Sequence, residues 1–216
     1  MTMVPDWQSR TLNTQGLCVA RAGVMVLEDL NFFLVAGQAL VLRGPNGLGK
    51  TTLLRTLAGL QPPLRGYVSD WQNDLSYAAH ADGLKSVLSV QENLSFWAEV
   101  YGHSAVTAAM EAMNLTALSR HRAAELSAGQ KRRLGLARLL VTGRWLWLLD
   151  EPTVSLDAAS VALFVGVVRA HLARGGAAII ATHVDLGLPE ARLLDLSPHR
   201  ARTNAPAPGG FDEAFT

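Results

Sequence analysis

Residues 44–52 read Gly-Pro-Asn-Gly-Leu-Gly-Lys-Thr-Thr, a glycine-rich loop of the kind that binds phosphate. An apolar run at residues 39–43 precedes the loop, and a helix-forming run at residues 51–58 follows it. Strand, loop and helix in this order point backbone N–H groups and the positive end of a helix dipole at an anion. The stretch therefore predicts an α/β fold, with Lys50 at the β- and γ-phosphates and Thr51 on Mg²⁺. The residues expected to contact phosphate are Gly44, Pro45, Asn46, Gly47, Leu48, Gly49, Lys50, Thr51 and Thr52.

Two adjacent carboxylates follow a second apolar strand. Residues 145–149 read Trp-Leu-Trp-Leu-Leu, Asp150 ends this run, and Glu151 comes next. In a parallel sheet Asp150 would face the glycine loop and hold Mg²⁺, directly or through water. Glu151 would then polarise a water that attacks the γ-phosphate. Without the glycine loop, two such acids would be ordinary loop charges. The two tryptophans are expected to pack in the sheet, since parallel strands are buried on both faces.

Three further short motifs follow in a fixed order. Ser127 and Gln130 are three residues apart, which is the spacing of a capping box at a helix start. Asp157 suits a helix N-cap, and a lone histidine such as His183 more often has a structural role. Each motif alone is ambiguous, although a second free helix N-terminus also suits an anion. The motifs are Leu126-Ser127-Ala128-Gly129-Gln130, Ser155-Leu156-Asp157 and Thr182-His183.

Taken together, the five motifs resemble those of ABC-type ATPases over about residues 12–196. The resemblance implies an ABC-type P-loop NTPase with a mainly parallel sheet flanked by helices and an N-terminal antiparallel β part. It also implies that ATP is hydrolysed between two copies of the chain, with ATP and Mg²⁺ as cofactors. Glu151 and His183 would then promote attack by water, and Asp157 would lie in a loop that crosses to the partner. The signature residues that would close over the partner's ATP are Ser127, Ala128, Gly129 and Gln130.

Three positions depart from the family pattern. The family carries a glutamine where this chain has His80, whose shorter ring could still contact water or Mg²⁺. An aromatic residue usually stacks on adenine near position 21, where this chain has Arg21, whose flat guanidinium could stack instead. Ala128 replaces a glycine of the signature and adds one methyl group near the phosphate without removing N–H donors.

Four features occur together: His80 in place of glutamine, the run Leu-Ser-Ala-Gly-Gln-Lys-Arg-Arg at residues 126–133, the strand Leu-Trp-Leu-Leu-Asp-Glu-Pro at residues 146–152, and a chain near the minimum length for the domain. This set resembles the ATPase subunits of the cytochrome c maturation system. That resemblance implies a polytopic inner-membrane permease subunit as partner, and indirectly a haem chaperone and a haem-handling membrane protein. Two activities are then open: haem export, or ATP-driven release of a haem-loaded chaperone. Other members are also compatible with the motifs, namely another small ABC exporter or a soluble ABC-type regulator. A small-molecule kinase would share only the glycine loop.

Composition limits the partners. The 216 residues are 49% hydrophobic and 17% charged, yet the chain has no uninterrupted apolar run long enough for a membrane span. Its start lacks the features of a signal peptide, and a net charge of +1 gives no sign of nucleic-acid binding. A single cysteine excludes an internal disulfide. We therefore expect a cytoplasmic protein that meets a membrane only through a partner, and the resemblance implies that this is at the cytoplasmic face of the inner membrane.

The order of strand and helix patterns predicts one domain over residues 1–198. A small helical subdomain is expected within it at about residues 85–142, including a helical stretch at 104–125. A further short helix is expected near residues 185–191. Residues 199–216, rich in Ala, Pro and Gly, are expected to form a flexible tail.

Overall fold

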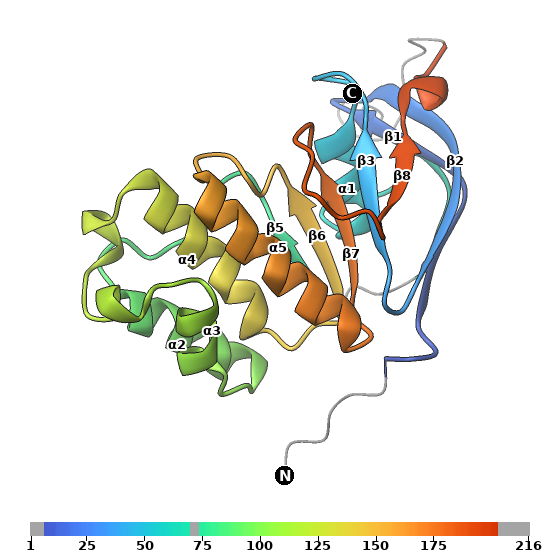
Figure 1. The fold of residues 1–216 in the computed structure, drawn as a ribbon. Helices are drawn as coiled ribbons and strands as arrows, with labels where there is room; N and C mark the ends of the chain where they lie inside the picture. Colours follow the sequence, from blue (N-terminus) through green and yellow to red (C-terminus); the bar gives the residue numbers. More distant parts are fainter. Residues whose placement is uncertain (1–6, 70–73, 203–216) are drawn as a thin grey trace, which may run out of the picture.

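The computed structural model describes residues 7–69 and 74–202, and its centre is a five-stranded parallel sheet (Figure 1). The strand order is β5-β6-β7-β3-β8, so strands distant in the sequence become neighbours. This sheet confirms the predicted α/β class. Its strands are β3 (Ala39–Arg43), β5 (Leu75–Ala78), β6 (Leu146–Asp150), β7 (Ala177–Ala181) and β8 (Arg192–Asp195).

The central strands of this sheet are buried on both faces. In β6, Leu146 and Leu148 belong to the core that contains helix α1 (Lys50–Leu57). Trp147 and Leu149 belong instead to the core that contains helix α5 (Ala158–Ala173). The alternation of side chains along a strand therefore divides one apolar run between two cores. The prediction that Trp145 and Trp147 pack in the sheet is confirmed.

A second, antiparallel sheet covers the α1 side of the molecule. It has the order β2-β1-β4 and consists of β1 (Thr11–Arg21), β2 (Val24–Val35) and β4 (Arg65–Val68). Ala22 and Gly23 join β1 to β2 with φ values of 49° and 76°. Positive φ at both central residues matches the twist of the hairpin strands. This sheet confirms the predicted N-terminal antiparallel part, and α1 packs between it and the parallel sheet.

The helical segment between β5 and β6 contains α2 (Val90–Tyr101), α3 (Val106–Ala112) and α4 (Ala128–Leu140). The prediction of a helical stretch at 104–125 was partly wrong, because α3 ends after seven residues. Asn114 has φ 51°, which breaks the helix, and only two short 3₁₀ turns follow. An alanine-rich composition favours a helix but does not determine where a left-handed residue ends it.

The prediction of a short helix near residues 185–191 was wrong. The chain turns here, with Gly187 at φ 59°, and its N–H donates to Oδ1 of Asp185. Pro189 follows two residues later. A local hydrogen bond from a backbone N–H to an aspartate side chain competes with the start of a helix, and this segment has one.

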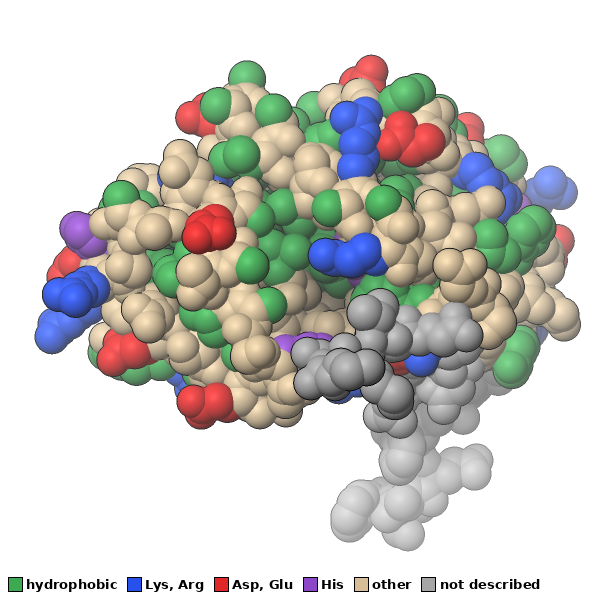
Figure 2. Space-filling view, turned by 60° about the horizontal axis from the view of Figure 1, so that its bottom comes forward, with side chains coloured by type: hydrophobic (Ala, Val, Ile, Leu, Met, Phe, Trp, Pro, Cys, Tyr) green, Lys and Arg blue, Asp and Glu red, His purple; other side chains and the backbone are tan. Residues whose placement is uncertain are grey.

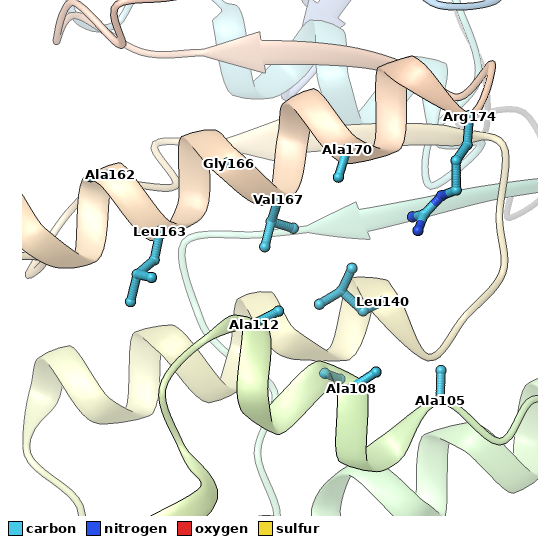
Figure 3. A pocket seen from close by; sticks show the side chains of 11 residues that line it. Ala105, Ala108, Ala112, Leu140, Ala162, Leu163, Gly166, Val167, Ala170 and Arg174 are labelled. Atoms are coloured by element: carbon cyan, nitrogen blue, oxygen red, sulfur yellow. The ribbon is translucent and has the colours of Figure 1, made fainter.

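An apolar groove of about 460 Å³ separates α5 from α3. Its walls are mostly alanine side chains, with Arg174 at one end (Figure 3). The helical segment therefore joins the rest of the molecule chiefly through α4, which packs against α5 and β5. On the face that Figure 2 shows, Lys and Arg side chains are scattered among acidic and hydrophobic ones.

The last described residues lie along β2. Leu27 and Arg200 form an antiparallel bridge, and the N–H of Ala201 donates to Val26 at 3.1 Å. The folded body therefore extends at least to Arg202, and only residues 203–216 of the expected tail lie outside the described residues. Within residues 7–69 and 74–202, none of the helices combines the length and apolar content needed to cross a bilayer.

A buried histidine of α5 lies beside Trp147 of β6 and Trp145 just before that strand. The ring of His171 stacks on Trp147 with 3.7 Å between centroids, and its Nε2–H donates to the carbonyl of Trp145 at 2.9 Å. Burial lowers the pKa of His171 from its ordinary value of 6.5 to about 4. Between these values the unfolded chain binds the proton more readily than the folded chain does. The contribution of neutral His171 to the free energy of unfolding is therefore fully present above about pH 6.5 and is lost as the pH falls towards 4.

Replacing His171 by glutamine should remove this pH dependence. We expect the wild-type protein to lose about 2 kcal/mol of unfolding free energy from this group between pH 7 and pH 5. His171→Gln should be less stable at pH 7 but should show a flatter change over the same range. Denaturant unfolding at both pH values measures this. His121→Gln, at an exposed position, is the control; equal slopes in wild type and His171→Gln would disprove the assignment.

Candidate functional site

The functional segments converge because they follow neighbouring parallel strands. The glycine loop follows β3, Asp150 ends β6, His183 follows β7 and His80 follows β5. Strands β5, β6, β7 and β3 are adjacent in the sheet and run in the same direction. Their carboxyl ends therefore lie along one edge, which is where ligands bind in open α/β sheets.

The glycine loop is held in a conformation that two glycines allow. Gly44 has φ 142°, and a Cβ there would come within 2.6 Å of Leu48 Cδ2. Gly49, the residue before α1, has φ 123° and closely approaches Val26 and Leu27. Larger residues rarely adopt such φ values. The loop therefore presents its backbone at the start of α1, as an anion site requires.

Lys50 is oriented before any ligand arrives. Its side chain is buried, and Nζ donates to the carbonyl of Gly44 at 2.7 Å and to that of Pro45 at 3.3 Å. These contacts satisfy the ammonium group while keeping it on the loop. A phosphate bound over the loop would accept hydrogen bonds from Nζ, and the ammonium group would act on it as a compact positive charge.

Two adjoining cavities bring the predicted nucleotide residues together. One, of about 250 Å³, contains Lys50 and both strand-end acids. The other, of about 350 Å³, runs from the glycine loop to β2 and includes Arg200, which sequence reasoning missed. Arg21 lines both. The first is lined by Arg21, Asn46, Gly47, Gly49, Lys50, Thr51, Thr52, Asp150 and Glu151, and the second by Arg21, Val24, Met25, Val26, Pro45, Asn46, Gly47, Leu48, Arg200 and Ala201.

Asp150 is buried at the end of β6, where Tyr77 of the adjacent strand supports it. The Tyr77 hydroxyl donates to Oδ2 of Asp150 at 3.4 Å. Burial raises the pKa of Tyr77 to about 12, and the charge of Asp150 adds to this effect. The phenol therefore stays protonated, so it remains a donor to the carboxylate at any working pH. The sequence contained no signal for Tyr77, because its role depends on which strand lies beside β6.

Glu151 faces His183. Its Oε1 lies 2.9 Å from Nδ1 of His183, while its Oε2 is buried without a hydrogen-bond partner among the described residues. A buried carboxylate oxygen normally accepts a hydrogen bond. The open oxygen therefore fits a water held at this point. The backbone of Glu151 has φ 45°, which is uncommon for any residue other than glycine.

The segment that carries His183 is held by an arginine that sequence reasoning missed. Arg43, directly before the glycine loop, donates from Nη1 to the carbonyl of Thr182 at 2.9 Å and from Nη2 to that of Val184 at 3.2 Å. The two bonds grip the chain on both sides of His183. The ring is otherwise exposed, at 60% of its side-chain area. It can therefore meet a ligand that arrives from outside the protomer.

The residues proposed for Mg²⁺ have the chemistry that the ion prefers. Thr51 offers a hydroxyl and Asp150 a carboxylate, and both line the smaller cavity. Mg²⁺ takes hard oxygen ligands and is usually bound by one or two protein groups together with water and substrate phosphates. In the described ranges, no group of three or more His, Cys, Asp or Glu could hold a metal alone. The site thus fits an ion that arrives with a nucleotide.

The signature residues lie apart from both cavities. Ser127 Oγ accepts from the N–H of Gln130 at 3.3 Å, and Gln130 Oε1 accepts from the N–H of Ser127 at 2.8 Å. The predicted capping box is therefore confirmed, and the Ser127 hydroxyl keeps its own hydrogen for another acceptor. Ser127 and Ala128 are exposed. A Cβ at Gly129 would come within 2.9 Å of the Ser155 carbonyl, so this glycine lets α4 approach the Asp157 loop.

Asp157 is confirmed as a helix N-cap. Its Oδ1 accepts from the N–H of Ser160 at 2.8 Å at the start of α5. Hydrogen bonds from Ser160 hold the pKa of Asp157 below its ordinary value. His80, in contrast, is exposed and lines neither cavity. The structure of one protomer therefore does not bring His80 to the nucleotide residues, and its role stays a prediction.

A phosphate loop at the start of α1, two acids at the end of β6 and a histidine after β7 define an ATPase of the P-loop class. The family model described as ABC transporter matches residues 27–154. The chain belongs to the ABC transporter family, and it is an ATP-hydrolysing ABC ATPase.

Named relatives cover nearly all of the chain. A Rhodobacter capsulatus protein is 67% identical over 199 residues, 92% of each chain, and a Paracoccus denitrificans protein is 61% identical over 94% of this chain and 98% of its own. Both are named cytochrome c biogenesis ATP-binding export protein CcmA. Among solved structures, a putative ABC transporter ATP-binding protein from Pyrococcus furiosus aligns with a TM-score of 0.79 and 25% identity. It covers 89% of this chain and all of its own.

Proposed function

We propose that this chain is the ATPase subunit of an ABC complex that serves c-type cytochrome biogenesis, by haem export or by release of a haem-loaded chaperone. One observation carries the proposal: an intact set of hydrolytic residues, Lys50, Asp150, Glu151 and His183, lies at one edge of the sheet. The names of the relatives at 61% and 67% identity supply the process.

Each residue has a defined task in the proposed hydrolysis. The loop N–H groups and Lys50 would hold the β- and γ-phosphates of ATP, and Thr51 and Asp150 would hold Mg²⁺, which would supply positive charge to the phosphates when bound. Glu151 polarises the attacking water at its open Oε2, and His183 approaches the γ-phosphate. Most of the rate enhancement then comes from positioning and electrostatics. Arg21 and Arg200 line the larger cavity, where the base and ribose would lie.

The separation of the two phosphate-binding surfaces supports a head-to-tail homodimer. The cap of α4 at Ser127 does not line the cavities of its own protomer. Its N–H groups and free hydroxyl hydrogen suit the γ-phosphate of a partner's ATP. The Asp157 loop, which contacts Gly129 through Ser155, would cross to the partner beside it. His80 would complete the water and Mg²⁺ environment as the dimer closes.

A membrane partner completes the proposal. The complex would include a polytopic inner-membrane permease, with this chain peripheral at the cytoplasmic face. Haem chaperone and haem-handling membrane protein would be indirect partners, and nucleic acid would not be one. The motifs also fit another small ABC exporter or a soluble ABC-type regulator, which a test in cells can separate from the proposed role.

The test is made in cells that need c-type cytochromes, in which Glu151→Gln replaces the native protein. We expect staining of the membranes for covalently attached haem to disappear, although the variant protein is still present at the membrane. The Glu111→Gln variant, changed at an exposed residue of α3, should stain normally. Normal staining with Glu151→Gln would reject the role in cytochrome c biogenesis. Recovery of the wild-type protein only from the soluble fraction, with its membrane partner made, would favour the soluble regulator.

A further inference from the structure

A buried arginine on α4 joins the ends of two neighbouring strands. Arg132 is only 4% exposed, although it lies on the same helix that begins after Ser127. Its guanidinium reaches the segments that follow β5 and β6. Its hydrogen bonds run from Nε to the Pro152 carbonyl (3.0 Å), from Nη1 to the carbonyls of Ala79 (3.0 Å) and His80 (3.4 Å) and to Asp82 Oδ1 (2.9 Å), and from Nη2 to the carbonyls of Asp150 (3.1 Å) and Glu151 (2.9 Å).

This set of acceptors suits an arginine and no other side chain. A guanidinium has five N–H donors in a fixed plane, whereas an ammonium has three donors around one atom. Backbone carbonyls beyond the end of a strand have no ladder partner and need one when they are buried. Arg132 supplies donors to several of these carbonyls at once, and the Asp82 carboxylate balances its charge.

One arm of the contact fixes the backbone of Glu151. The carbonyl of Glu151 accepts from Arg132, while its N–H donates to the carbonyl of Ala181 at 2.8 Å. The residue is thus held on both sides in its left-handed conformation, with φ 45°. Strained backbone of this kind persists only when its surroundings impose it. The same carbonyl also accepts from the N–H of Val154 at 3.3 Å, so Arg132 is one of two donors that hold this backbone where the carboxylate faces His183.

The other arm fixes the loop that carries His80. Arg132 binds the carbonyl of His80, and the loop packs closely on α4. A Cβ at Gly135, one turn further along the helix, would come within 2.8 Å of Asp82 Oδ1. A Cβ at Gly83 would come within 2.9 Å of Arg138 Nη1. The two glycines therefore let loop and helix meet at the distance that the Arg132 contacts need.

We propose that Arg132 is a positioning residue for ATP hydrolysis, holding Glu151 and the His80 loop in one fixed arrangement on the signature helix. The inference rests on the proposed roles of Glu151 and His80. It assigns no contact between Arg132 and the nucleotide, because Arg132 lines neither of the two cavities that contain the predicted nucleotide residues. Arg132 variants should therefore lose rate and keep ground-state affinity, because misplacing a reacting group by about 1 Å can cost about 10²-fold.

The first test compares two adjacent arginines of the purified full-length protein. Arg132→Lys should lower kcat by about ten- to hundred-fold with little change in ATP affinity, since lysine keeps the charge but not the fork. Arg133→Lys is the matched control, because Arg133 also donates to backbone carbonyls, those of Met113 and Asn114, but away from the strand ends. Rates are expressed per bound nucleotide, so a partly unfolded sample does not count as slow. Equal kcat in the two variants would overturn the proposal.

The second test separates positioning from general loss of structure. If Arg132 acts through Glu151 and the His80 loop, the Arg132→Lys change should alter the residual single-turnover rate of the double variant Glu151→Gln/His80→Ala by less than about three-fold. The same large fold-loss in the wild-type background and in this double variant would overturn the proposal. Should Arg132→Lys not fold, Asp82→Asn weakens one contact and should lower kcat by about three- to ten-fold; unchanged kcat would overturn it. A Glu151→Gln variant as fast as wild type would instead reject the proposed role of Glu151.

Discussion

Glu151→Gln should lower ATP turnover by about 10²- to 10⁴-fold and leave ATP affinity nearly unchanged. The substitution keeps the length of the side chain, and an amide can still meet Nδ1 of His183, now 2.9 Å from Oε1. What it removes is the charge on Oε2, the buried oxygen with no described partner. An amide does not accept the proton of an attacking water. Phosphate release measures turnover, and titration with a fluorescent ATP analogue measures affinity.

The same variant tests the proposed dimer. Because binding continues and hydrolysis stops, Glu151→Gln with Mg²⁺ and ATP should elute as a long-lived dimer in size-exclusion chromatography. Glu111→Gln should elute and turn over like the wild type, since this residue is exposed on α3. Turnover above about a tenth of the wild-type rate in Glu151→Gln would remove this residue from the water-activating role. If Glu151→Gln binds ATP but elutes as a monomer, the head-to-tail dimer is rejected, while the assignment of the chain as an ATPase is unaffected.

The sequence predicted those parts of the site that each follow one strand. The glycine loop, the Asp150–Glu151 pair and the Thr182–His183 pair come directly after apolar runs. Strands of a parallel sheet end along one edge, so these motifs could be placed together without knowing the strand order. The capping box at Ser127 was also predictable, because a box needs only residues three apart.

The supporting residues could not be predicted in this way. Arg132 meets residues 18 to 53 positions away, and Arg43 meets Thr182, 139 positions away. Tyr77 reaches Asp150 only because β5 lies beside β6. Such contacts depend on the order β5-β6-β7-β3-β8, which local patterns do not give. Arg200 is a further case, because its segment returns to β2 from the far end of the chain.

Lys50→Ala should differ from Glu151→Gln by weakening ATP binding as well as hydrolysis. In the described structure Nζ of Lys50 is held over the loop by the carbonyls of Gly44 and Pro45, so its charge is already beside the expected β- and γ-phosphates. Removing a charged group that meets the developing charge of a transferred phosphoryl group costs about 10²- to 10³-fold in rate. We expect a loss of turnover in this range, together with at least about tenfold weaker ATP affinity from the lost charge-assisted bond.

Lys85→Ala is the matched control for Lys50→Ala, since it removes the same charge from an exposed lysine before α2. Its affinity and turnover should equal those of the wild type, and both variants should retain the melting temperature of a folded domain. Wild-type turnover in Lys50→Ala would reject the whole site, because every other role assigned here depends on phosphates held at this loop. Lost turnover with unchanged affinity would instead mean that the loop N–H groups alone bind the ground state. Lys50 would then act only on the charge that develops during transfer.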